Sequence, residues 1–344
     1  MYWTFRSGTW GKWKVHNAVQ EGGTAMLSII VPVYNVDKVL RHCLNSLRFQ
    51  SYRNIEIILI NEGSSDMSGA ICDRFARVDS RFKVLHKKVK GHSEALNVGL
   101  LSAKGEYISF VDPVDRIDGL MFEKLILTII KNQADMVIAN YGEELDRLEQ
   151  EPIESSQTVI WSKEEALKKI VDQFRLKSFL CNKLFSIDLF RTDPVLEFDL
   201  TLDIFGDLLM SVQCILKSKK IIYDPNLYYH YIAYKHASFF NELSKEKLSG
   251  PKALLRIIDL TKGINDFDIS TIKDHYINYS IQLLMHLLNE KYQNLQQIEE
   301  VKQNLYYFSI SELNSQQAKL SCLIARKMTS IYFNFWKIRN KPLD

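Results

Sequence analysis

Short apolar runs alternate with stretches of helical periodicity over residues 27–140. The first run, Leu27–Val33, is typical of a buried strand, and apolar side chains then recur at helical spacing from Val39 to Leu47, in a helix that Asp37 is expected to cap. The alternation continues with strands expected at 55–60, 82–85, 107–111 and 136–139, and with helices at about 66–78, at 93–101 and from 120. This order predicts an α/β fold with a mainly parallel, doubly wound sheet.

The pattern changes after residue 145. Helices are expected at Trp161–Phe174 and Phe205–Leu216, and a strand at Lys220–Tyr223. Residues 226–240 are rich in aromatic side chains, and residues 250–344 have a helical pattern almost throughout. We therefore expect three parts: an N-terminal extension at 1–26, an α/β domain at 27–245 with halves at 27–140 and 141–245, and a helical C-terminal region at 246–344.

The first 26 residues show neither helical nor strand periodicity, and they lack the continuous apolar stretch of a signal peptide. The first patterned segment begins directly after Met26. We interpret Met26 as the start of the protein and residues 1–25 as an unstructured, upstream-translated extension. The chain has no run of about 18 uncharged apolar residues, so no transmembrane helix is expected.

Composition excludes several kinds of site. Of the 344 residues, 46% are hydrophobic and 25% are charged, as in globular proteins. The five cysteines are odd in number and widely spaced, which excludes a disulfide framework and a zinc site built on paired cysteines. A reducing, cytoplasmic compartment is expected.

Charge is distributed unevenly, with +5 over residues 319–344 and −4 over residues 27–318. The mildly acidic body argues against nucleic acid as a partner of the main fold. Residues 319–341 combine aromatic, aliphatic and basic side chains at helical spacing. Such a helix either lies in the interface of an anionic membrane or packs against the α/β domain or a second subunit, and the sequence leaves both open.

Polar and acidic residues follow three of the expected strands. They are Tyr34 and Asn35 after the first strand, Asn61–Asp66 after the second, and Asp112–Asp115 after the strand that begins at Tyr107. Because ligands of parallel sheets bind beyond the carboxyl ends of the strands, these loops are expected to form one binding site.

Four ordered motifs cover these loops. They read LSIIVPVYN up to Asn35, ILINEGSSD up to Asp66, GHSEALNVGL from Gly91 and GEYISFVDPVD up to Asp115. Together they resemble GT-A glycosyltransferases of family 2, in particular the bacterial enzymes that build capsule, exopolysaccharide or cell-wall polysaccharide. The resemblance is strong over residues 27–140, weaker over 178–240, and absent beyond about 245.

The resemblance implies an inverting transfer of a sugar from a nucleotide donor, a UDP-sugar, to a hydroxyl of a growing, lipid-linked surface polysaccharide at the inner face of the membrane. It implies that Asp207 deprotonates the acceptor hydroxyl and that Asp112, with Asp115, binds a divalent metal, Mn²⁺ or Mg²⁺. The residues that the resemblance places at the donor nucleotide are Pro32, Val33, Tyr34, Glu62, Gly63, Ser64, Asp66, Asn97 and Asp112. Tyr229 and His230 would line the acceptor region.

The chain departs from the family pattern at several polar positions. Val114 stands where an acidic metal ligand is expected, and valine offers no oxygen. Leu96 and Gly206 replace an arginine and a glutamate that are common in the family. Either Asp115 or a water takes over at the metal, or the enzyme works with weak or no metal, or the chain is a catalytically degenerate partner or scaffold subunit. The expected protein partner is a second copy of the chain, in an oligomer, or a partner glycosyltransferase.

Each candidate also has a purely structural interpretation. Glu62 and Asp66 are residues that close turns on their own backbone. Asp112 can cap the end of a strand, and Asp207 can be an acid stabilised by the dipole at a helix N-terminus.

Overall fold

The computed structural model describes residues 25–88, 91–143, 157–172, 180–232, 245–289 and 294–339. The expected N-terminal extension lies outside the described residues apart from Ala25 and Met26. Residues 233–240 of the aromatic segment and the last five residues of the basic C-terminus also lie outside them.

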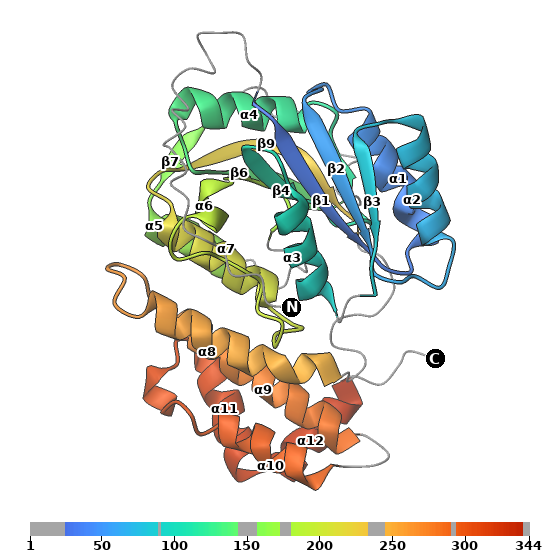
Figure 1. Cartoon of the computed structure of the whole chain (residues 1–344). Coiled ribbons are helices and arrows are strands. Elements are labelled where there is room, and N and C mark those ends of the chain that lie inside the picture. Colours follow the sequence, from blue (N-terminus) through green and yellow to red (C-terminus); the bar gives the residue numbers. More distant parts are fainter. Residues whose placement is uncertain are drawn as a thin grey trace.

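One mixed sheet forms the centre of the α/β domain (Figure 1). Its strands are β1 (Leu27–Val33), β2 (Ile55–Asn61), β3 (Phe82–His86), β4 (Tyr107–Phe110), β5 (Arg116–Ile117), β6 (Met136–Glu143), β7 (Val159–Trp161), β8 (Lys183–Ser186) and β9 (Ile221–Tyr231). They are ordered β3-β2-β1-β4-β8-β6-β9-β5, and β7 pairs with β9 outside this path.

The expected parallel arrangement holds for half of this sheet. Strands β3, β2, β1 and β4 are parallel neighbours, as predicted. Strand β8, which the periodicity did not reveal, lies antiparallel between β4 and β6, and β9 pairs in parallel with β6 but antiparallel with β5 and β7. The prediction of a mainly parallel sheet is therefore wrong for the second half, where antiparallel pairs of strands that are not consecutive in the chain stand beside the parallel pair of β6 and β9.

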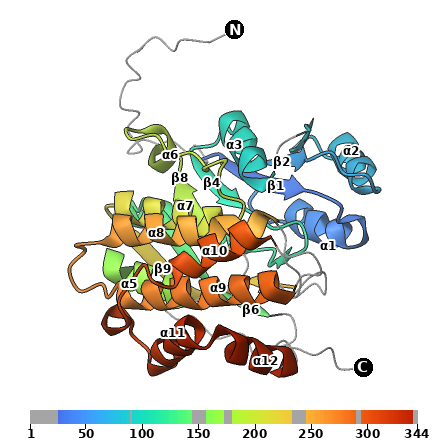
Figure 2. The same cartoon turned by 90° about the horizontal axis from the view of Figure 1, so that it is seen from below.

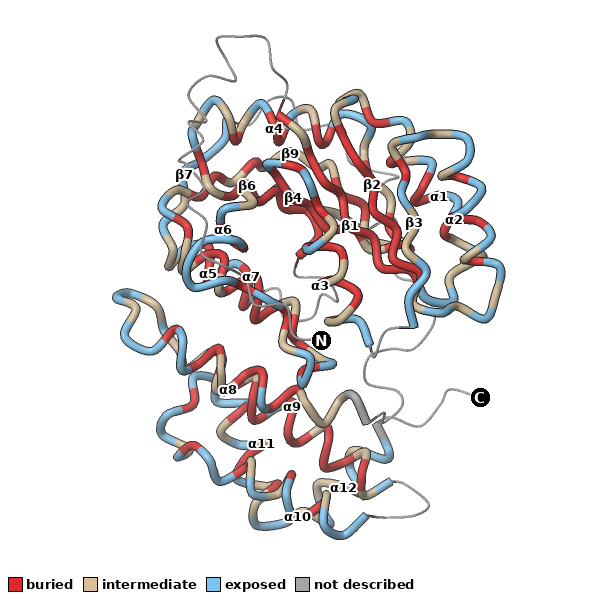
Figure 3. The backbone as a smooth tube through the Cα atoms, in the orientation of Figure 1, coloured by how far each residue is buried: buried red, intermediate tan, exposed pale blue. Residues whose placement is uncertain are grey.

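Helices cover both faces of the sheet. They are α1 (Asp37–Arg48), α2 (Ser68–Val78), α3 (His92–Ser102), α4 (Met121–Asn132), α5 (Lys163–Asp172), α6 (Asp188–Arg191) and α7 (Gly206–Lys217). Ile30 and Ile60 belong to the core that contains α3 and α7, whereas Ile29 and Val31 belong to the core that contains α1 and α4. Burial of β1 and β2 on both faces, red in Figure 3, explains their continuous apolar sequences.

The C-terminal region is a layer of helices packed beneath α7 (Figures 1 and 2). Its helices are α8 (Gly250–Thr261), α9 (Ser270–Asn289), α10 (Leu295–Asn304), α11 (Gln316–Lys327) and α12 (Thr329–Arg339). Side chains of α8 and α9 share one hydrophobic core with α3 and α7. None of the described helices is long and apolar enough to cross a bilayer.

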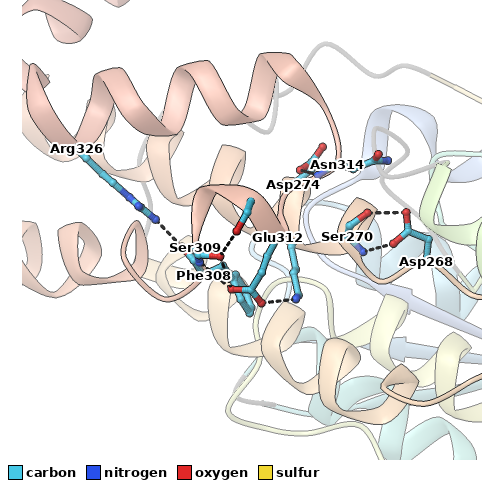
Figure 4. A network of polar contacts seen from close by, with 10 residues as sticks. Asp268, Ser270, Asp274, Phe308, Ser309, Glu312, Asn314 and Arg326 are labelled. Atoms are coloured by element: carbon cyan, nitrogen blue, oxygen red, sulfur yellow. Dashed lines mark hydrogen bonds and ion pairs between the residues drawn. The ribbon is translucent and has the colours of Figure 1, made fainter.

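Buried and half-buried polar contacts fix the turn before α11 against α9 (Figure 4). The Asp274 carboxylate on α9 accepts hydrogen bonds from the backbone N–H groups of Asn314 (2.8 Å) and Ser315 (2.7 Å). Arg326 on α11 donates to the carbonyl oxygens of Leu305 and Phe308. One side of α11 is thereby held against the layer.

One expected helix cap is wrong. Asp37 is the first residue of α1, and the cap position is occupied by Val36, which has no polar side chain. The Asp37 carboxylate instead accepts a hydrogen bond from the backbone N–H of Met67 (3.3 Å), at the start of α2. Asp37 therefore joins two loops.

Close contact between α3 and the sheet depends on Gly99. A Cβ atom at this position would lie 2.4 Å from Cγ2 of Ile30 and 3.2 Å from Cδ1 of Ile60. We expect Gly99→Ala to lower the free energy of unfolding by about 1–3 kcal/mol through overpacking, although alanine favours helices over glycine. Urea denaturation measures this change. Leu101→Ala, at an exposed position of the same helix, is the control, and equal stability of the two variants would contradict the packing argument.

Candidate active site

The parallel register brings the loops after β1, β2 and β4 to one edge of the sheet. Val33 pairs with Asn61, and Ile30 pairs with Phe110, so the residues that follow each strand lie side by side. The loops that begin at Tyr34, Glu62 and Val111 therefore meet at this edge, as the sequence predicted. We refer to this region as the site edge.

Hydrogen bonds lock the first two loops together. The Asn35 backbone N–H donates to Oγ of Ser64 (3.1 Å), and the Ser65 backbone N–H donates to Oδ1 of Asn35 (2.9 Å). Asp66 accepts from the backbone N–H groups of Asp37 (3.1 Å) and Ser68 (2.9 Å). Partial burial raises the pKa of Asp66, but the hydrogen bonds from Ser68 and the backbone outweigh it and lower the pKa overall.

These contacts show which residues hold the loops in place and which side chains face outward. Ser64 and Asp66 hold the loop, and Gly63 adopts a φ of +80°, which favours glycine. Tyr34 keeps 58% of its side chain exposed, directly after the buried Pro32 and Val33. Tyr34 thus offers an aromatic ring, the kind of surface on which a nucleotide base stacks.

The turn after β4, residues 112–115, which we call the acidic turn, presents one partly exposed carboxylate. Oδ1 of Asp112 accepts from the backbone N–H of Val114 (3.1 Å), and the Asp112 carbonyl accepts from the backbone N–H of Asp115 (3.1 Å). The side chain of Asp112 lies at the surface of the site edge, whereas Asp115 points inward and is fully buried.

Asp115 is held from behind by β9. The Tyr229 hydroxyl donates to Oδ2 of Asp115 (2.6 Å), and the Ile232 backbone N–H donates to Oδ1 (2.9 Å). Burial, and then the nearby charge of Asp112, raise the pKa of Asp115 to about 8. Because of the two hydrogen bonds, both carboxylate oxygens of Asp115 are engaged in supporting the turn.

The residues of this turn do not fit a divalent metal ion. Mn²⁺ and Mg²⁺ take several oxygen ligands, but Val114 has none and the oxygens of Asp115 are buried against their donors. In the part of the chain that the structure describes, no three His, Cys, Asp or Glu side chains are grouped to hold a metal ion. Of the two carboxylates in this turn, only that of Asp112 is partly exposed.

Helix α7 brings Asp207 to the same region. Asp207 lies in the first turn of α7, where Oδ1 accepts from the backbone N–H of Leu208 (2.8 Å). The segment before α7 is tied to α3, because Oγ of Ser93 donates to the Leu202 carbonyl (3.0 Å). Asn97 also exchanges two hydrogen bonds of 2.8 Å with the backbone of Phe198.

Three predicted site residues therefore have structural contacts that the sequence did not reveal. Asn97 joins α3 to the segment before α7, and its predicted contact with the donor remains untested. Tyr229 and His230 are 2% and 4% exposed, and the Tyr229 hydroxyl contacts the acidic turn through Asp115. Their burial does not favour the predicted contact with an acceptor.

Two basic side chains near the site edge were missed. Lys183 on β8 is buried, and its Nζ donates to Oδ1 of Asn182 (2.8 Å) and to the Cys181 carbonyl (3.3 Å). His92 is the first residue of α3, and its Nδ1 lies 3.9 Å from Oε1 of Glu62. Lysine within an apolar run and histidine at a helix start have no periodicity signal, so only the fold reveals their positions.

The buried amine of Lys183 gives a testable pH dependence. Burial lowers the pKa of Lys183 to about 8, against an attraction to Asp207 that raises it. Between about pH 8 and pH 10 the folded protein releases this proton while the unfolded chain keeps it, so the free energy of unfolding rises with pH.

We expect the stability of the wild type relative to Lys183→Met to rise by on the order of 2–3 kcal/mol from pH 7.5 to 10.5, measured by urea denaturation. Lys124→Met, at an exposed position of α4, controls for loss of a surface charge. A difference between wild type and Lys183→Met that does not change with pH would contradict the assignment.

Comparison with known proteins connects this geometry to a family. Residues 28–184 match the family model described as Glycosyl transferase family 2. The chain is 45% identical over 117 residues to glycosyltransferase GlyG of Streptococcus pneumoniae serotype 4, which covers 34% of this chain and 39% of that protein. It is 33% identical over 211 residues to the putative glycosyltransferase EpsH of Bacillus subtilis, which covers 60% of this chain and 61% of EpsH. The chain thus spans less than two thirds of either relative.

The fold is similar to that of S. aureus TarS 1–349, with a TM-score of 0.67, 17% identity and 91% of each chain covered. This coverage extends into the C-terminal helices, where the sequence carries no family resemblance. Residues 28–184, which contain the loops of the site edge and α3, match glycosyl transferase family 2, and the chain has the GT-A fold.

Proposed function

We propose that this chain transfers a sugar from a UDP-sugar to a hydroxyl of a growing surface polysaccharide. The observation that carries the proposal is the meeting of Tyr34, Glu62, Asp112 and Asp207 at the site edge of a family 2 fold. The choice of donor is supported by the likeness to TarS, whose structures include complexes with UDP-GlcNAc and UDP.

The side chains divide the work of binding the donor. Tyr34, with Pro32 and Val33 behind it, frames the base, and the Glu62 carboxylate accepts hydrogen bonds from it. Asp112 accepts from the ribose hydroxyls, since its carboxylate is the partly exposed one of the acidic turn. Asp115 supports Asp112 through the turn that Tyr229 braces.

Asp207 acts as general base in a direct displacement with inversion. The acceptor oxygen forms a bond to the anomeric carbon, the bond from that carbon to the diphosphate oxygen breaks, and the hydroxyl proton moves to the Asp207 carboxylate. The N-terminal end of α7 stabilises the ionised carboxylate, which keeps it ready to accept a proton.

The acceptor is proposed to be lipid-linked and reached at the cytoplasmic face of the membrane. The supporting surface is formed by α11 and α12, which we call the C-terminal surface. Its exposed apolar residues are Leu320, Leu323, Met328, Ile331, Phe335 and Ile338. Residues 316–339 also contain five lysines and arginines and no acidic residue, a composition suited to anionic lipid.

The opposite side of α12 packs on the protein. Trp336 donates from Nε1 to Oε1 of Gln282 (3.0 Å), and its ring meets that of His286 edge-on. The sequence left two alternatives for this helix, contact with a membrane and packing on the protein. Our proposal combines them, because one side of α12 rests on α9 while the other side remains available to a membrane.

Loss of the general base tests the catalytic proposal. We expect Asp207→Asn to lower the rate of UDP release from UDP-GlcNAc, or from whichever UDP-sugar the chain uses, about 10²–10⁴-fold. Asp188→Asn removes an acid from the first turn of another helix, α6, and should leave the rate unchanged. UDP binding without turnover of any UDP-sugar by the wild type, in the presence of membrane lipid extract, would favour the degenerate partner subunit instead.

Membrane attachment is tested with vesicles of phosphatidylcholine and phosphatidylglycerol. We expect the chain to sediment with these vesicles, and the double variant Phe335→Asp, Ile338→Asp to stay in solution, because both side chains are at least 69% exposed and their replacement spares the core. Leu101→Asp, an exposed leucine on α3, is the control. Equal sedimentation of all three proteins, or none by the wild type, would contradict the proposed surface.

A further inference from the structure

We propose that His92 binds the diphosphate of the donor with a positively charged imidazole, in place of a metal ion at the acidic turn. This inference rests on the proposed function, because it concerns the same donor site. It assigns to the first residue of α3 a direct contact with the donor.

The position of His92 is the first argument. Helix α3 begins at His92, after Gly91, whose φ of +102° turns the chain into the helix. The imidazole Nδ1 lies 3.9 Å from the Glu62 carboxylate, and the side chain remains 58% exposed. His92 therefore contacts one predicted donor residue and still has a free surface for a ligand.

The charges around His92 are the second argument. The carboxylates of Glu62, Asp207 and Asp112, which come from three different segments, all act electrostatically on the imidazole. A nucleotide diphosphate brings further negative charge to these carboxylates, so its binding requires a compensating cation. The acidic turn does not provide a metal site, because Val114 has no ligand atom and Asp115 is engaged.

The protonation of His92 agrees with this arrangement. Desolvation lowers the pKa of His92, but the interaction with Glu62, and then the charges of Asp207 and Asp112, outweigh it and raise the pKa above its ordinary value. A cation at the first position of a helix is otherwise disfavoured by the helix dipole. The surrounding carboxylates offset this cost, and a bound anion would offset it further.

Other charged side chains also lie near the site edge, and their surroundings differ from those of His92. The Lys88 side chain lies beside Gly63, with its Cγ 3.7 Å from the position of a Cβ there, and Asp203 lies beside Gly91. Lys183 is fully buried and donates to neighbouring carbonyl oxygens. Among these groups, His92 combines exposure with contact to Glu62.

In the proposed reaction the imidazolium keeps its proton. It stabilises the negative charge that develops on the diphosphate as the bond to the anomeric carbon breaks. Its contribution is electrostatic, and UDP binding is sufficient to detect it.

Isothermal titration with UDP tests the inference, first in EDTA and then with Mn²⁺. We expect the wild type to bind UDP in EDTA, and His92→Gln to bind it about tenfold or more weakly, as expected for loss of a charged hydrogen bond. His92→Arg should restore most of the affinity, because it restores the charge. His42→Gln, an exposed histidine on α1, is the control and should bind like the wild type.

Val114→Asp supplies the oxygen ligand that the acidic turn lacks. We expect Mn²⁺ to raise the UDP affinity of this variant more than that of the wild type. Wild-type binding that requires Mn²⁺, or equal binding by His92→Gln and wild type, would overturn the role of His92 while leaving the proposed function intact. Failure of the wild type to bind UDP under either condition would contradict the proposed function itself.

Discussion

The parallel pairing of β1 with both β2 and β4 is the constraint on which the site depends. It aligns the carboxyl ends of three strands, so that residues from three separate loops meet at one edge of the sheet, where hydrogen bonds join the first two loops. The pairing is stable because β1 and β2 are buried on both faces, with α3 on one face and α1 on the other. Gly99 sets how closely α3 approaches, and therefore where His92 at its start is placed.

Contacts that are distant in the sequence complete the site. Tyr229 braces Asp115 from 114 residues away, and Asn97 ties α3 to the segment that leads into α7 and Asp207. The C-terminal helices share their core with α3 and α7, so they stabilise the position of Asp207, the proposed general base. The acidic turn thus has a buried scaffold but no oxygen ligand at Val114, and the imidazole of His92 lies nearby, beside Glu62.

Local periodicity was sufficient to predict the parallel half of the fold. The strands β1, β2 and β4 are mostly apolar, β3 less so, and they alternate with helices; each strand was located to within a few residues. Strand β8 was missed because Lys183 interrupts its apolar pattern, and a buried lysine is explained only by its hydrogen-bond partners. The loops of the site edge were predicted from strand order, but the roles of Asp115, Tyr229 and His92 depend on contacts between distant segments, which no single-sequence pattern contains.

The central claim is that the site edge binds a nucleoside diphosphate between the acidic turn and the start of α3. A crystal structure of the chain with UDP, determined without added metal, tests it most directly. We predict the uracil ring beside Tyr34 and Glu62, the ribose at Asp112, and the diphosphate within hydrogen-bond distance of His92. UDP bound elsewhere, or bound at the site edge with its diphosphate turned away from His92, would contradict it.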